Sequence, residues 1–225
     1  MQAVLAKYPS IRFVAPFAAF MVFLGLGPAL PLSPRAEAVL RIGVLSAVIW
    51  AVARPVLSFR MVRPASTIAI GVGIFVLWIA PDQLIPGYRD SGLFQNSVTG
   101  QVESSMSVEM RTDPLVLLLR FLRAVVIVPI VEELFFRGWL GRWVDHMDDF
   151  RKSPLGQFST FAFWATAALF AVEHGPYWEV GLAAGVIFNW WMVKTKSLAD
   201  LIWCHAVANG CLSGWVFATG QWQYW

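Results

Sequence analysis

The chain has 225 residues, of which 58% are hydrophobic and only 14% are charged. Its mean hydropathy of +0.62 is too high for the surface of a water-soluble domain, so the composition indicates a polytopic membrane protein. The net charge of +3 comes from short basic clusters between apolar runs. Because these clusters do not form one basic stripe, we expect no nucleic-acid partner.

Seven apolar runs are candidates for crossing a hydrocarbon core of about 30 Å, which takes about 20 helical residues. A break at Pro129, or a short extra segment before it, would raise their number to eight. We therefore predict an all-α bundle of about seven to eight transmembrane helices. The runs lie near residues 13–32, 38–57, 66–86, 115–140, 158–174, 177–193 and 197–219.

The first run is longer than the apolar part of a secretory signal and further runs follow it, so we interpret it as an uncleaved helix. Within residues 1–86 the runs carry almost no ionisable side chain, and Arg41 lies close enough to a run end to snorkel. We predict one integral membrane domain over residues 1–225. In it, residues 1–86 are accessory helices, 87–113 a polar loop and 114–219 the functional core.

Basic residues gather in three of the connections, whereas the 82–113 connection is mainly acidic. The positive-inside rule then places the amino terminus inside and the acidic connection outside. We expect an integral protein of a bacterial-type inner (cytoplasmic) membrane. The three clusters are Arg54, Arg60 and Arg63; Arg142, Arg151 and Lys152; and Lys194 and Lys196.

Two adjacent carboxylates and an arginine interrupt the apolar run in VEELFFRGWL, residues 131–140. On a helix, Glu133 and Arg137 are four positions apart and share a face, which favours an ion pair. Glu132 points about 140° away from Arg137 and has no neighbouring cation. A desolvated, unpaired carboxyl is suited to taking and returning a proton near neutral pH. The alternative is a purely structural salt-bridge network that anchors two helices.

Two further stretches place polar groups within apolar runs. In ALFAVEHGP, residues 168–176, His174 ends a run directly before a Gly–Pro break. In SLADLIWCHAVANG, residues 197–210, His205 and Asn209 are four positions apart and lie about 12 Å from the helix start. At that depth an imidazole and a carboxamide must line a polar cavity or bond across helices. We therefore expect an intramembrane cavity on which Glu132, His174, His205 and Asn209 converge.

These three stretches resemble the motifs of one family. EELFFR matches EExxxR, FAVEH matches FxxxH and HAVAN matches HxxxN of the CPBP family, the CAAX-protease and bacteriocin-processing intramembrane endopeptidases. The resemblance covers about residues 115–215, with the motifs in the family's order. KTKSLADLIWCHAVANG is also similar to the family's usual approach to its last motif. The chain further resembles the exosortase-associated, CAAX-protease-related branch of that family.

The resemblance implies an all-helical intramembrane endopeptidase that hydrolyses a peptide bond of a membrane-associated protein or peptide, lipidated or not. In the family's mechanism a glutamate and a histidine activate water, while a histidine and an asparagine stabilise the oxyanion. The catalytic residues implied here are Glu132, His174, His205 and Asn209. Glu133 and Arg137 would support the architecture. The expected partners are membrane lipids and the substrate.

Metal dependence has two readings. Glu132, His174 and His205 are the ligand types of a catalytic zinc site, but they come from three separate helices and no HExxH helix is present. We expect catalysis without a cofactor, with a zinc-dependent version of the same protease as the alternative.

Two other classes of protein remain. A non-enzymatic membrane immunity or partner-binding protein would keep the polar cluster only to hold its helices together. A transporter would use buried Glu and His as a proton relay, but it would carry ionisable groups in both halves. The nearly bare runs of residues 1–86 disfavour the transporter.

Overall fold

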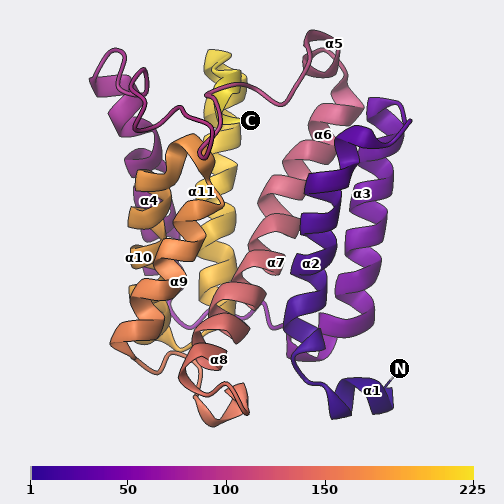
Figure 1. Cartoon of the computed structure of the whole chain (residues 1–225), viewed down its shortest axis with the longest axis vertical. Helices are drawn as coiled ribbons and strands as arrows, with labels where there is room; N and C mark the ends of the chain where they lie inside the picture. The colour runs from indigo at the N-terminus through magenta and orange to yellow at the C-terminus, as the bar shows by residue number, and fades with distance from the viewer. Residues whose placement is uncertain (1) are drawn as a thin grey trace.

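The computed structural model describes residues 2–225 as a bundle of helices (Figure 1). Within these residues no strand forms beyond one isolated bridge between Asn96 and Gly100, and the all-α prediction is confirmed. The helices are α1 (Gln2–Lys7), α2 (Ile11–Leu26), α3 (Pro34–Val48), α4 (Pro64–Leu84), α5 (Val108–Arg111), α6 (Pro114–Leu122), α7 (Val128–Glu133), α8 (Gly141–Asp145), α9 (Thr160–Val172), α10 (Trp178–Thr195) and α11 (Leu198–Thr219).

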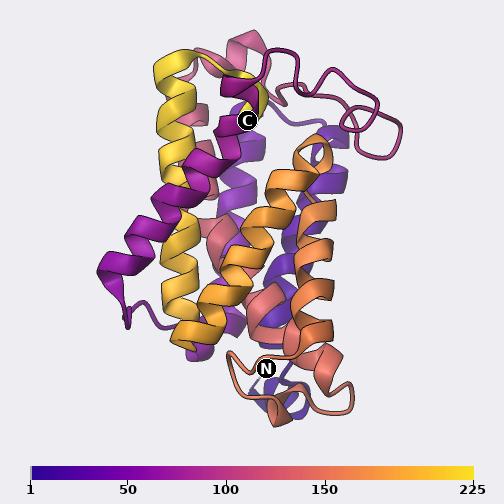
Figure 2. The same cartoon turned by 90° about the vertical axis from the view of Figure 1, so that its left-hand side faces the viewer.

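The long helices form two groups. In Figure 1, α2, α3 and α6 stand on the right, whereas α4, α9, α10 and α11 stand on the left. Figure 2 turns the left-hand group toward the viewer and shows α4 crossing in front of α11. Helix α7 passes diagonally from the right-hand group to the base of the left-hand one. It therefore connects the two groups.

Helices α6, α7 and α8 are parts of one continuous helix, Pro114–Asp145, of 32 residues. At 1.5 Å per residue it is about 48 Å long, so it must tilt to fit a hydrocarbon core of about 30 Å. Two π-helical segments, Arg123–Ile127 and Leu134–Leu140, bracket α7. The helix continues through Pro129 because a π-helical segment precedes it and accommodates the missing N–H, so no eighth span arises there.

Each of the predicted runs contains a helix, and four stretches are long and apolar enough to cross a membrane: Pro34–Val56, Pro64–Leu84, Pro114–Asp145 and Leu198–Thr219. Helix α9 is shorter than its predicted run because it ends at Val172. Its 13 residues rise only about 20 Å. The chain then leaves the α-helix in a turn over residues 173–177, which contains His174.

The polar connection between α4 and α5 folds over the upper end of the bundle (Figure 1). There it contacts the back half of the chain, residues 114–219. Its buried Arg89 forms ion pairs with Asp82 at 2.8 Å and Glu179 at 2.7 Å. The same guanidinium donates to the carbonyl of Pro176 at 2.6 Å. The connection therefore fixes the turn that follows α9.

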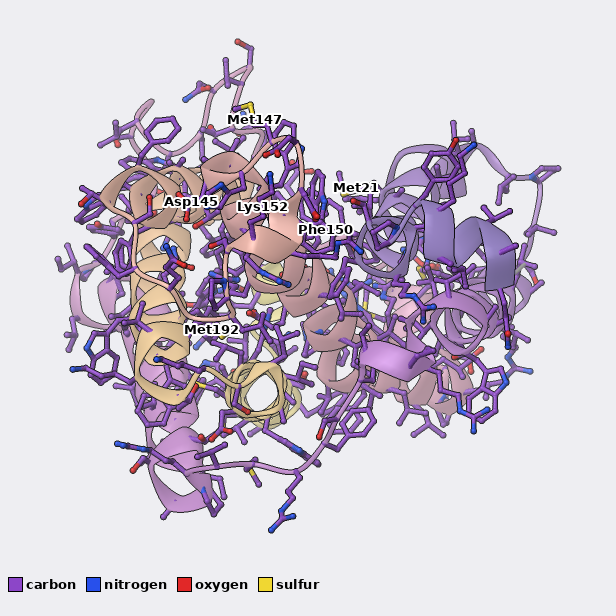
Figure 3. All side chains as sticks on the ribbon, turned by 90° about the horizontal axis from the view of Figure 1, so that it is seen from below. Met21, Asp145, Met147, Phe150, Lys152 and Met192 are labelled. Atoms are coloured by element: carbon purple, nitrogen blue, oxygen red, sulfur yellow. The ribbon has the colours of Figure 1, made fainter. Side chains whose placement is uncertain are left out.

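The lower end of the bundle is closed by the turn between α8 and α9, which Figure 3 views from below with Met147 and Lys152 labelled. Phe150 in this turn is buried and packs edge-on against Phe13 of α2, with 5.4 Å between ring centroids. The guanidinium of Arg142 lies over the Phe150 ring, 4.9 Å from its centroid. The two helix groups are thus held together at this end.

Helices α4 and α11 approach closely at Gly71, which is buried. A Cβ at this position would lie 2.5 Å from the carbonyl oxygen of Cys204 and 2.9 Å from Cβ of Val207. Glycine is therefore required by the close approach of the two backbones, not by a turn.

We expect Gly71→Ala to destabilise the bundle by about 1–3 kcal/mol, because the added methyl group meets backbone that cannot rotate away. Gly73→Ala is the matched control on the same helix, since a Cβ there meets no atom within 4 Å. It should be neutral or stabilising by up to about 1 kcal/mol. Thermal unfolding in detergent, followed by circular dichroism, measures both, and equal melting temperatures would contradict the packing described.

Candidate active site

A cavity of about 380 Å³ lies between the two helix groups. It extends from the middle of the bundle to the upper end, where the polar connection and the C-terminal segment contribute Glu103 and Gln223 to its wall. All four side chains that the sequence predicted to converge line this one cavity. They are Glu132, His174, His205 and Asn209.

Glu133 and Arg137 form the predicted i,i+4 ion pair, with 3.1 Å between Oε1 and Nη1 and both side chains buried. Arg137 also donates from Nε to Oδ1 of Asn189 on α10 at 3.0 Å. The Asn189 amide in turn donates to Oγ1 of Thr166 on α9 at 2.9 Å. This network joins the long helix to α9 and α10. Asn189 was not predicted, although a lone carboxamide inside an apolar helix is a signal for bonding across helices.

Glu132 takes no part in that network. Its side chain is buried and lies on the cavity wall. Among the residues that the structure describes, its Oε2 atom has no hydrogen-bond partner. Nε2 of His205 lies 3.9 Å from this atom, which is beyond hydrogen-bonding distance. The sequence prediction that Glu132 lacks a close cationic partner is therefore confirmed.

His205 is held by the carboxylate next to Glu132. Its Nδ1 lies 3.0 Å from Oε1 of Glu133. Because Glu133 is paired with Arg137, its carboxylate accepts this hydrogen bond and Nδ1 of His205 donates it. The other ring nitrogen, Nε2, is left facing Glu132. One carboxylate thus orients the histidine while its neighbour stays free.

His174 occupies the turn after α9, and its Nδ1 lies 2.7 Å from the carbonyl oxygen of Phe170. A carbonyl can only accept, so Nδ1 carries the proton and Nε2 remains an acceptor. The Phe170 ring packs against His174 at 4.6 Å and against His205 at 6.1 Å between centroids. Gly181 leaves room for the imidazole, since a Cβ there would lie 3.2 Å from its atoms.

Asn209 lies on α11, one turn above His205. Its Nδ2 donates to the carbonyl oxygen of Ala124 at 2.8 Å, within the π-helical segment of the long helix. A carboxamide nitrogen has two hydrogens, so one N–H remains for a group in the cavity. His205 and Asn209 therefore line one cavity from one helix, as their spacing predicted.

Helices α2 and α4, which precede the polar connection, form part of the cavity wall through Phe20, Ile74 and Trp78 among others. The prediction that Arg41 snorkels to a run end is wrong. Its side chain is buried, donates to Glu37 at 2.6 Å and to the carbonyl of Phe23 at 3.1 Å, and lies on the cavity wall. The bond to Glu37 explains this, because a guanidinium can stay buried once a carboxylate pairs with it.

Two of the three side chains considered as zinc ligands are histidines, and each is hydrogen-bonded through its Nδ1 atom. His205 uses Nδ1 for Glu133, and His174 uses Nδ1 for a backbone carbonyl. Across residues 2–225 no group of three His, Cys, Asp or Glu side chains is arranged to hold a metal ion. Both histidines keep Nε2 available, and a hydrogen bond from Nδ1 is compatible with metal binding through Nε2.

Comparison with known proteins adds independent information. Residues 114–211 match the model of the type II CAAX prenyl endopeptidase Rce1-like family. This segment, which is less than half of the chain, is similar to the Rce1-like family. Neither a curated protein nor a solved structure matches the chain.

The Rce1-like segment begins with the long helix and ends within α11, so it contains every residue of the three motifs. The resemblance to CAAX proteases is thus confirmed for the back half. Rce1-like proteins are CAAX proteases and therefore hydrolases, and residues 114–211 of this chain are similar to them. A protease of this kind acts on membrane-associated substrates.

We expect Arg137→Gln to lower the free energy of unfolding by about 3–5 kcal/mol, because it leaves the Glu133 carboxylate buried without its ion-pair partner. Arg151→Gln is the matched control: Arg151 pairs with Asp149 on the exposed lower turn, at 2.8 Å. Its loss should change stability little. Thermal unfolding in detergent compares the two variants, and equal stabilities would contradict a buried network.

Proposed function

We propose that the chain hydrolyses a peptide bond of a membrane-associated protein or peptide, lipidated or not, with Glu132 as the base. The observation that carries this proposal is the free Oε2 atom of Glu132 on the wall of a cavity. Two histidines and one asparagine line the same cavity. Peptide hydrolysis requires a base and hydrogen-bond donors at one place, and this cavity contains both.

In the proposed first step, Glu132 takes a proton from water, and the water oxygen attacks the peptide carbonyl carbon. Nε2 of His174 accepts the second hydrogen of this water and orients it, since Nδ1 is held by Phe170. The carbonyl becomes a tetrahedral oxyanion. Glu132 then gives its proton to the amine nitrogen, the oxyanion re-forms a carbonyl as the C–N bond breaks, and a carboxylic acid and an amine leave.

The oxyanion receives hydrogen bonds from α11. Asn209 offers the amide N–H that Ala124 does not use, and His205 donates from Nε2 when that atom is protonated. Loss of one such donor typically costs on the order of 3 kcal/mol of transition-state stabilisation. In this proposal no cofactor takes part.

We also propose that the protein lies in a bacterial-type inner membrane with its amino terminus inside. Two turns at one end of the bundle carry basic clusters, over residues 54–63 and 146–159. The polar connection with its acidic residues lies at the opposite end. The positive-inside rule supports this orientation. The cavity then extends toward the non-cytoplasmic side.

Glu132→Gln should abolish proteolysis while leaving the fold intact, because the amide keeps the shape of the side chain but is not a base. Quantitative mapping of protein termini in membrane fractions is the measurement, with termini present in the wild type and absent in the variant expected. Glu109→Gln, an exposed glutamate that does not line the cavity, is the matched control and should retain every terminus.

Identical termini in the wild type and in a folded Glu132→Gln variant would favour a membrane immunity or partner-binding protein instead. Zinc analysis of the same purified preparations tests the cofactor proposal. Stoichiometric zinc that disappears together with activity in His205→Ala would assign the activation of water to a metal.

The orientation can be tested by labelling intact cells with a membrane-impermeant thiol reagent, in a background where Cys204 and Cys211 are replaced by alanine. Ser97→Cys, in the polar connection, should label because it faces the outside. Met147→Cys, on the exposed lower turn, should label only after the cells are opened. The reverse pattern would invert the proposed topology.

A further inference from the structure

Two arginines lie on the cavity wall above Glu132, on the same helix. Arg120, Arg123, Ala124, Val128 and Glu132 all line the cavity. Arg120, Ala124, Val128 and Glu132 follow one another at intervals of four positions, and Arg123 reaches the same cavity from the π-helical segment Arg123–Ile127. A stripe therefore leads from the proposed base to a pair of guanidinium groups near the upper end.

Neither arginine has a carboxylate partner within residues 2–225. Arg120 donates to Oγ of Ser105 at 2.7 Å, and its guanidinium lies 5.4 Å from the ring centroid of Trp225. Arg123 has no hydrogen bond or ion pair from its side chain to any residue of the described part of the chain. Their charge is therefore not neutralised by an ion pair, unlike that of Arg41 or Arg137.

Two carboxylates lie on the same pocket walls as Arg120 and Arg123. Glu37 lines a small pocket together with Arg41, Arg120 and Arg123, and it is hydrogen-bonded to Arg41. Glu103 lines the upper part of the main cavity. Neither lies within ion-pair distance of Arg120 or Arg123, as the structure describes them. Of these three guanidinium groups, only that of Arg41 is paired with a carboxylate in the part of the chain that the structure describes.

Snorkelling toward the membrane surface is the ordinary explanation for an arginine near a helix end. It fits Arg120, which reaches the polar connection through Ser105. It does not account for Arg123, which lies nine positions, or about 13 Å, into the helix and faces the cavity. Unpaired charge at such a depth is costly and marks a pathway or a ligand site.

We propose that Arg120 and Arg123 bind a carboxylate of the substrate, which rests on the proposed function of this cavity. A guanidinium binds a carboxylate through two parallel hydrogen bonds, so an arginine pair is suited to this anion. Arg123 and Arg120 lie nine and twelve positions from Glu132, which corresponds to roughly 14–18 Å along the helix. An extended peptide rises about 3.3 Å per residue, so about four to five residues separate this carboxylate from the scissile bond.

The intervening wall defines the rest of this substrate. Leu24, Phe75 and Val128 line the cavity together with further apolar and aromatic side chains. The residues between the scissile bond and the carboxylate are therefore apolar. The carboxylate itself can belong to an acidic side chain or to the end of the peptide, because both present the same two oxygens.

Binding can be measured in the Glu132→Gln variant, so the result does not depend on whether the protein hydrolyses anything. The probes are a dansyl-labelled apolar octapeptide with a free carboxyl end, the same peptide as its carboxamide, and the carboxamide with one glutamate five residues from the label. Energy transfer from the protein's tryptophans to the dansyl group reports binding. At least one carboxylate peptide should bind about tenfold more tightly than the plain carboxamide, or better.

Arg120→Gln with Arg123→Gln should remove this preference and leave binding of the carboxamide unchanged. If the double variant does not fold, the single variant Arg123→Gln is measured in its place, with the same expected result. Arg111→Gln is the matched control: it removes an arginine from the same end that does not line the cavity, and the preference should persist. Which carboxylate peptide gains affinity identifies a chain end or a side chain as the source.

Equal affinity for all three peptides overturns the proposal, as does a preference that survives in the variants. Absence of binding by every peptide overturns it as well. Proteolysis that depends on Glu132, with no effect of either arginine on peptide affinity, would leave the proposed function standing and remove only the carboxylate site.

Discussion

The buried ion pair between Glu133 and Arg137 is the interaction on which the back half of this bundle depends. It occupies one carboxylate of an adjacent pair and fixes a guanidinium against Asn189 of α10. The same carboxylate accepts the hydrogen bond from His205 of α11. Three helices are thereby joined around charges that could not remain buried singly. A fourth joins through Thr166 of α9, which accepts from Asn189.

This arrangement also explains why the Glu132 carboxylate has no ion-pair partner in the network. Adjacent positions on a helix diverge by about 100°, so the two carboxylates cannot both face Arg137. One is neutralised within the network and the other is presented to the cavity. The stabilising interaction and the reactive group are therefore neighbours in sequence, and the position of the first determines that of the second.

The cavity follows from how the two helix groups are joined. The lower turn closes them together through Phe150 and Phe13, whereas the upper end is spanned by a polar connection. That connection holds the turn carrying His174 through Arg89, so it is part of the site's framework. Arg120 and Arg123 then give the upper cavity a positive character opposite in sign to the base below.

The sequence predicted the contacts and shared helix faces of residues that lie close together in the chain. The apolar runs, the Glu133–Arg137 pair and the shared face of His205 and Asn209 depend only on hydrophobicity and on 3.6 residues per turn, so the sequence alone determined them. The end of α9 before His174, the buried state of Arg41 and the bond from Arg137 to Asn189 depend on which helices become neighbours. Contacts between distant helices have no fixed spacing in the chain, and for that reason only the tertiary structure decided them.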